Sequence, residues 1–197
     1  MPFRFCVLCD ASLDGPAGVA GIGVVIKLVN SDNITDEHPL LFAWNKLRSR
    51  PYRPDIAEKK AILFASVLSN HVILRRRIRE ICGPGNLLSA TILNDCEGAG
   101  NRVQTNIRNG GVLAELVKYF KDYYGKDLDI VWEGNRNHAQ QHPLALVDWM
   151  ANQARLQLPK VGQTVYARDG NGLDDWLRHR RAEAEAAARA RALEAPW

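Results

Sequence analysis

The sequence lacks any long apolar run. No segment approaches the roughly 18 consecutive apolar residues that span a membrane, although 46% of the 197 residues are hydrophobic. The apolar stretch at the N-terminus is interrupted at Asp10, which is too early for the apolar region of a secretory signal. We therefore expect a protein without a membrane segment or an export signal, located in the cytoplasm or the nucleus.

Cysteine is also scarce, with four residues in the chain. Cys6 and Cys9 have the C-x-x-C spacing of many metal sites, but they lie in an apolar run that is typical of a strand. Residues three apart on a strand point to opposite faces, so the two thiols do not easily share a metal ion. No second pair and no cluster of cysteine with histidine follows, which predicts reduced thiols in the core of an intracellular protein.

Neither sign of charge is in large excess. The formal net charge is +4 at pH 7, and this mild basicity permits a nucleic-acid partner without requiring one. The length fits one domain with its own core, with room for an extra segment at one end.

The apolar pattern predicts a mixed α/β fold. Three strand-like segments come first, at 3–9, 19–29 and 40–44, with short connections typical of an antiparallel meander. Gly21 and Gly23 lie inside the second segment and indicate a bulge or a close backbone approach. The remaining expected elements alternate: helix 55–81, strand 87–93, a short helix within 97–109, helix 112–124, strand 128–132 and helix 144–156. This order predicts a mixed five-stranded sheet, antiparallel in its first three strands and parallel afterwards, flanked by helices.

The C-terminal part differs in composition. We expect a catalytic domain over 1–157, a glycine-containing linker over 158–172 and a helical tail rich in alanine and arginine over 173–197. Self-association of the tail, a contact with a partner protein, or neither, all remain open.

Four acidic residues occupy positions that an open sheet can bring together. Asp10 and Asp95 each close an apolar strand, Glu58 lies in the first turn of the long helix, and Asp148 lies on the last helix. Each alone is typical of a solvated acid or a helix cap. Ligands of open α/β sheets bind at the edge where such strands end, so the four together indicate a site.

Five segments in this order resemble motifs of the ribonuclease H family. Asp10-Ala11-Ser12 is similar to its D-G-S strand motif, and four more segments are similar to its later motifs: 21–26 (GIGVVI), 57–63 (AEKKAIL), 92–96 (ILNDC) and 132–154. The resemblance covers about residues 3–156 and implies a type 1 ribonuclease H-like fold.

The resemblance also implies an activity, namely metal-dependent hydrolysis of the RNA strand of RNA–DNA hybrids. Two Mg²⁺ ions, replaceable by Mn²⁺, would stabilise charge at the attacking and leaving oxygens. We expect Asp10 to bridge them, Glu58 and Asp95 to complete one site, and Asp148 to complete the other.

His138, ten residues before Asp148, is a candidate for assisting proton transfer or product departure, with His142 as its competitor. Contacts to the substrate are expected from Ala11, Ser12 and Leu13. Phosphate contacts are expected from Arg75 and Arg76, although a basic helix end in solvent is an equal alternative for the arginines. Trp44 and Trp132 are expected in the core.

Two departures leave hybrid specificity open. The chain has Arg53-Pro54-Asp55 where the family often has polar amides, and Cys96-Glu97 where it commonly has Ser-Gln. Alternatives are a non-catalytic nucleic-acid-binding module of the same fold and a related nuclease acting on another nucleic acid. Ser12, where exonucleases of this fold carry an acid, argues against one such nuclease class.

Overall fold

A computed structural model describes residues 3–29, 37–49, 53–83, 86–132, 144–158 and 160–167. Its strands are β1 (Phe3–Asp14), β2 (Val19–Val29), β3 (Glu37–Arg48), β4 (Leu87–Asn94), β5 (Leu128–Trp132) and β6 (Thr164–Ala167). Its helices are α1 (Pro54–Ser69), α2 (Val72–Cys82), α3 (Glu97–Arg108), α4 (Val112–Tyr124) and α5 (Ala145–Gln157).

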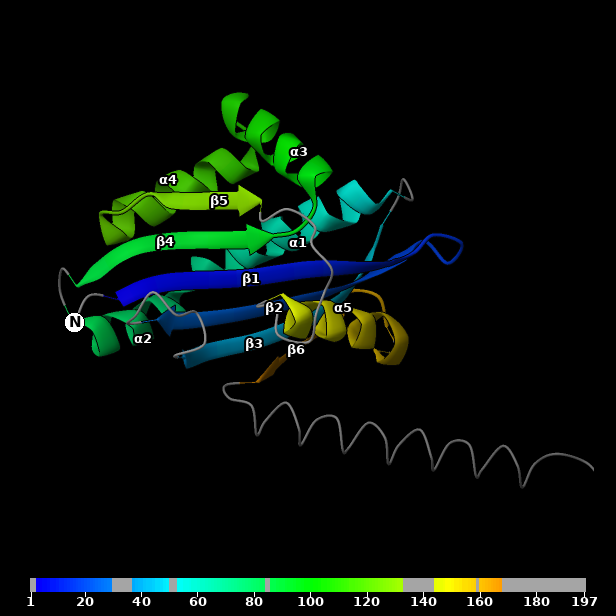
Figure 1. The fold of residues 1–197 in the computed structure, drawn as a ribbon, viewed down its shortest axis with the longest axis horizontal. Coiled ribbons are helices and arrows are strands. Elements are labelled where there is room, and N and C mark those ends of the chain that lie inside the picture. Colours follow the sequence, from blue (N-terminus) through cyan, green and yellow to red (C-terminus); the bar gives the residue numbers. More distant parts are fainter. Residues whose placement is uncertain are drawn as a thin grey trace, which may run out of the picture.

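The strands form one mixed sheet in the order β5-β4-β1-β2-β3-β6 (Figure 1). Antiparallel pairs join β1 to β2 and β2 to β3, whereas β4 lies parallel to both β1 and β5. The expected ribonuclease H-like fold, a three-stranded antiparallel meander continued by parallel strands, is therefore confirmed with one strand more than predicted.

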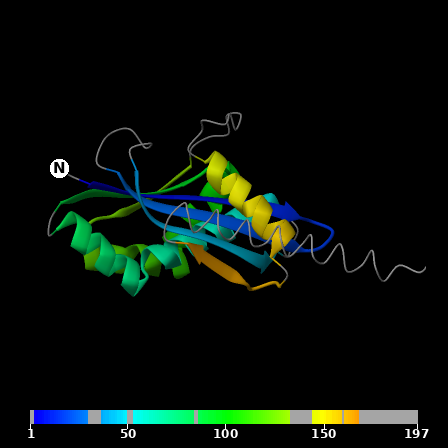
Figure 2. The same cartoon turned by 90° about the horizontal axis from the view of Figure 1, so that it is seen from below.

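Alternate residues of the central strands enter different cores. On β1, Phe5, Val7 and Cys9 pack in the core formed with α1, α2, α3 and α4. Cys6 and Leu8 belong to a second core, on the face covered by α5. The sheet thus lies between helices on both faces (Figures 1 and 2), and the first cysteine pair is divided between two cores, as the strand spacing predicts.

The long helix expected at 55–81 is two helices, α1 and α2. Near the end of α1, the Ser66 and Ser69 hydroxyls donate to backbone carbonyls four residues earlier. The Asn70 side chain donates both to Ser66 O, at 2.9 Å, and to Leu116 O on α4, at 3.2 Å. Side chains that hydrogen-bond to nearby backbone groups compete with continuation of the helix. The hydrogen bond from Asn70 to α4 stabilises the conformation in which α1 ends at this residue.

The segment expected as a linker contains β6. It pairs antiparallel with residues 42–45 of β3, where it covers the backbone groups of an otherwise open edge. The last residue of β6, Ala167, is buried in the core beneath α5. Strand formation here depends on the free edge of β3, and the local composition of the linker contains no information about that edge.

No helix in the described segments is both long and apolar enough to cross a membrane.

Candidate active site

Three of the expected acids meet near the carboxyl ends of β1 and β4. Asp10, Glu58 and Asp95 each offer a carboxylate oxygen, and these oxygens all lie within 4.8 Å of one another. The fold explains the meeting, because β1 and β4 are parallel neighbours and α1 packs across β1. Asp10 pairs with Gly23 inside the β1–β2 hairpin rather than ending its strand, since β1 continues to Asp14.

Burial and mutual repulsion perturb two of these acids. Asp10 and Glu58 are each 6% exposed. Burial, followed by the charge of Asp95, raises the pKa of Asp10 to about 7. Burial and the charge of Asp10 raise the pKa of Glu58 well above its ordinary value. Crowded carboxyls of this kind retain a proton near neutral pH unless a cation replaces it.

Asp148 lies in the first turn of α5 and is half-buried. Its negative charge contributes to the raised pKa of Asp10, so it acts on the same site from the opposite face of the sheet. It is not among the acids whose oxygens lie within 4.8 Å of one another. The structure thus brings three predicted acids together and places the fourth within electrostatic reach of Asp10.

A hollow of about 380 Å³ opens beside the acids. It is lined by Pro54, Glu58, Asp95, Cys96, Glu97 and Trp132. Trp132, expected in the core, is 43% exposed because it ends β5 at the edge of the sheet, and its Nε1 donates to Asp95 O at 2.7 Å. The prediction for Trp132 is wrong, whereas that for Trp44 is confirmed at 1% exposure.

Glu97 is exposed in the first turn of α3. A carboxylate at this position is favoured by the unpaired amides of the helix N-terminus. Its place on the wall of the hollow gives the site an additional negative charge that a bound anion would meet.

The two arginines expected to contact phosphates are engaged elsewhere. Arg75 is 6% exposed and stacks on the rings of Tyr119 and Tyr123 at 4.6 and 4.2 Å. Arg76 pairs with Glu80 one turn later. Both lie on α2, beside the start of β1 and away from the acids (Figure 1). Arg75 therefore stabilises the α2–α4 contact, because its guanidinium group forms cation–π interactions with aromatic rings on α4.

The three β1 residues proposed to contact substrate are half-buried. The Ser12 Oγ accepts a hydrogen bond from Arg155 Nε at 2.9 Å, which ties this part of β1 to α5. A substrate contact by Ala11, Ser12 or Leu13 stays a prediction. His138, His142 and the 173–197 tail lie outside the described residues.

Asn94, which the sequence reasoning missed, lies within hydrogen-bond distance of Glu58. It is the last residue of β4 and is 1% exposed. The available signal was its position: a polar side chain directly between the apolar strand and Asp95.

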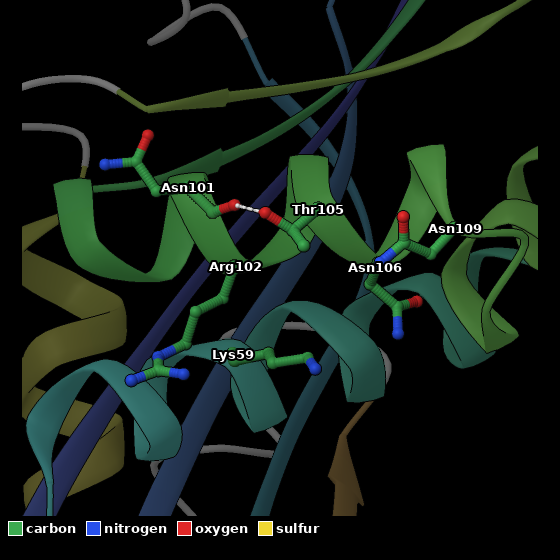
Figure 3. A pocket seen from close by; sticks show the side chains of 6 residues that line it. All are labelled: Lys59, Asn101, Arg102, Thr105, Asn106 and Asn109. Atoms are coloured by element: carbon green, nitrogen blue, oxygen red, sulfur yellow. Dashed lines mark hydrogen bonds between the residues drawn. The ribbon is translucent and has the colours of Figure 1, made fainter.

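A second hollow, of about 360 Å³, lies between α1 and α3 and was also missed. Its lining carries amides, a hydroxyl and two cations: Lys59, Asn101, Arg102, Thr105, Asn106 and Asn109. In Figure 3 the Lys59 side chain extends between the two helices toward Asn106, while Arg102 extends from α3 toward α1. Arg102 forms an ion pair with Asp55, whereas Lys59, the neighbour of Glu58, has no carboxylate partner in the described part of the chain.

No protein-family model and no curated protein matches this chain. Similar solved structures include an RNase H1 isolated from compost, at 16% identity and a TM-score of 0.47, covering 80% of this chain and 99% of that one. An RNase H1 from the halophilic archaeon Halobacterium salinarum NRC-1 is 14% identical, with a TM-score of 0.42 and coverages of 77% and 96%. LC9-RNase H1, a type 1 RNase H with the type 2 active-site motif, is 14% identical, with a TM-score of 0.45 and coverages of 89% and 81%. Strand order and pairing, rather than these superpositions, define the fold of this chain.

Proposed function

We propose that this protein is a metal-dependent endonuclease of the ribonuclease H type, which hydrolyses the RNA strand of RNA–DNA hybrids. The observation that supports this best is the convergence of the Asp10, Glu58 and Asp95 oxygens within 4.8 Å at one end of the sheet. Buried like charges destabilise a fold unless a cation compensates them. A purely structural module gains nothing from such a cluster.

The donor set fits a hard divalent ion. Carboxylate oxygens are the ligands that Mg²⁺ and Mn²⁺ prefer. Burial, and then the charge of Asp95, raise the pKa of Asp10, and a bound cation would favour its ionised form. Asp10, Glu58 and Asp95 would hold one ion, and Asp10 with Asp148 a second. Bound there, the ions would supply an activated water and charge stabilisation at the leaving oxygen.

The other residues of the site suit the binding of a nucleic-acid backbone. The hollow between α1 and α3 offers Lys59, which follows Glu58 in the sequence of α1, together with uncharged amides and a hydroxyl. Such groups bind phosphate and sugar oxygens without reading base sequence. Trp132 presents an exposed aromatic surface at the edge of the hollow, where it can contact a sugar or base.

Cleavage of labelled RNA–DNA hybrid, double-stranded RNA and single-stranded RNA in Mg²⁺ tests this function. We expect cutting of the hybrid alone, with a loss of at least about a hundredfold in Asp10→Asn. Asp129→Asn is a matched control, because Asp129 is an exposed acid on β5 that does not belong to the cluster. Equal cutting of double-stranded RNA would redirect the proposal to another substrate, and tight binding without cutting would contradict it.

A further inference from the structure

The Asn94 side chain connects the three elements that carry the clustered acids. Its Nδ2 donates to Glu58 Oε2 at 3.0 Å and to Cys9 O at 3.1 Å. Its Oδ1 accepts from Cys96 N at 3.0 Å. One amide therefore contacts the carboxylate on α1, the backbone just before Asp10 and the backbone just after Asp95.

This set of contacts determines the orientation of the amide. The Cys96 N–H can only donate, so the oxygen of Asn94 must face it, and both hydrogens of Nδ2 are then directed at Cys9 O and Glu58. The two bonds that Nδ2 donates are buried, where hydrogen bonds to a charged group are stronger than in water. The Asn94 side chain is therefore held at each of its polar atoms.

The fixed amide of Asn94 in turn restricts the orientation of the Glu58 carboxylate. The terminal torsion of a glutamate is broad, so an unrestrained carboxylate rotates freely about its last bond. A donor fixed on the sheet and directed at Oε2 restricts that rotation, and fixing the orientation of a ligand in this way supports metal binding.

The chemistry of the side chain is also suited to this place. A lysine here would neutralise Glu58 and compete with a metal ion, and an aspartate would add another like charge to Asp10, Glu58 and Asp95. An amide supplies a donor without changing the net charge of the site.

We propose that Asn94 is a positioning residue for the metal site, holding the Glu58 carboxylate, the backbone of β1 next to Asp10 and the backbone after Asp95 in the arrangement that binds the ion. This inference rests on the proposed function in its metal requirement. It does not depend on which nucleic acid is cut.

The test compares Asn94→Leu and Asn94→Thr with Asn45→Leu in the full chain. Leucine has the same number of side-chain heavy atoms as asparagine, branched at the same carbon, and no donor, whereas threonine keeps one hydroxyl donor. Asn45 is the matched control, because it is also a buried strand amide, 6% exposed, whose Nδ2 donates to Thr164 Oγ1 at 2.6 Å, apart from the acids. Mg²⁺ and Mn²⁺ binding is measured by titration calorimetry, at a temperature where circular dichroism shows each variant folded.

We expect Asn94→Leu to raise the Mg²⁺ dissociation constant about 10- to 100-fold, as loss of a group supporting a metal ligand does. The KM for hybrid at saturating Mg²⁺ should not change, and Asn94→Thr should recover part of the affinity. Asn45→Leu should lower the melting temperature and leave metal binding intact. If Asn94→Leu does not fold, Asn94→Thr is measured in its place. Its Mg²⁺ dissociation constant should still rise, but by less than about 10- to 100-fold, because threonine keeps one donor.

Equal Mg²⁺ constants for the Asn94 variants and the unaltered chain would overturn the inference, as would the same loss of affinity in Asn45→Leu. An unaltered chain that binds Mg²⁺ but cuts no nucleic acid would contradict the proposed function alone. An unaltered chain that binds no divalent ion would overturn both.

Discussion

Single residues at the acidic site are held in conditions that ordinary surface acids avoid. Asp10 is 6% exposed and lies within range of the charges of Asp95 and Asp148. A carboxyl whose pKa is raised by folding stabilises the fold at low pH, and this contribution is lost as the pH rises through the folded value. For Asp10 that window runs from its ordinary pKa of 3.8 to about 7.

The substitution Asp10→Asn should therefore stabilise the metal-free protein near neutral pH. An amide has a similar shape and no charge, so the repulsion disappears. We expect the variant to melt above the unaltered chain at about pH 8, by about 2–4 °C for each kcal/mol gained, and by clearly less at about pH 5, because much of the window lies above that pH. Differential scanning calorimetry in a chelating buffer measures both.

Added Mg²⁺ supplies the complementary measurement. It should raise the melting temperature of the unaltered chain, more at about pH 8 than at about pH 6, because the ligands must lose their protons to bind it. Asp10→Asn should show little of this rise. If the variant melts below the unaltered chain at the higher pH, then burial and charge repulsion do not make the ionised Asp10 carboxylate destabilising.

At the scale of elements, the contact between α5 and β2 depends on two glycines. A Cβ on Gly21 would overlap the backbone of Ala151 and Arg155, and one on Gly23 would overlap that of Val147. The close approach indicated by glycines inside a strand is thus confirmed, and its partner is the helix that carries Asp148. The sequence pattern marked the positions, but only the tertiary structure identified what approaches them.

Gly21→Ala should displace α5 and disturb both stability and activity. We expect a loss of about 1–3 kcal/mol in the free energy of unfolding, the usual cost of overpacking, measured by urea titration. Gly100→Ala is the matched control, because its new Cβ would lie 3.4 Å from the Trp132 Cβ, in ordinary contact, inside α3. Alanine is a better helix former than glycine by up to about 1 kcal/mol, so this control should be neutral or stabilising. Equal losses in the two variants would contradict the account of the α5 contact.

The hollow between α1 and α3 gives a second prediction at this scale. Lys59→Gln should weaken binding of RNA–DNA hybrid to the Asp10→Asn protein and lower the slope of log affinity against log salt by about 1, as loss of one phosphate contact does. Lys118→Gln is the control, since Lys118 is paired with Asp122 on the exposed side of α4. Fluorescence anisotropy at several salt concentrations measures both. An unchanged slope in Lys59→Gln would show that Lys59 in this hollow does not contact the nucleic acid.

The whole molecule is a sheet between two cores, and its stability should decrease from the centre to the edges. The central strands β1 and β2 are buried on both faces, whereas β6 has four residues and pairs on one side only within the described chain. Strands with few buried contacts open locally before the rest of a fold.

Hydrogen exchange followed by mass spectrometry should show this gradient. Amides of β1 and β2 should exchange most slowly and those of β6 early. Added Mg²⁺ should slow exchange around residues 95–99 and the first turn of α1, because the ion would join these segments to β1. Protection by Mg²⁺ confined to parts distant from the acids would place the ion elsewhere.

The sequence by itself determined the order and type of most elements, because apolar periodicity records which face of a strand or helix is buried. It also indicated that Asp10, Glu58 and Asp95 could converge, because Asp10 lies on the first strand, Asp95 directly follows the fourth strand and Glu58 lies near the start of a helix. Tertiary structure decided the rest. Arg75 is an unremarkable basic residue in sequence, and its burial between two tyrosines depends on α4 lying beside α2. The same holds for β6, which needs the free edge of β3, and for Asn94, whose role depends on three segments meeting around one amide. Contacts between segments distant in the chain leave no local pattern, and these are the contacts that place the groups around the acids.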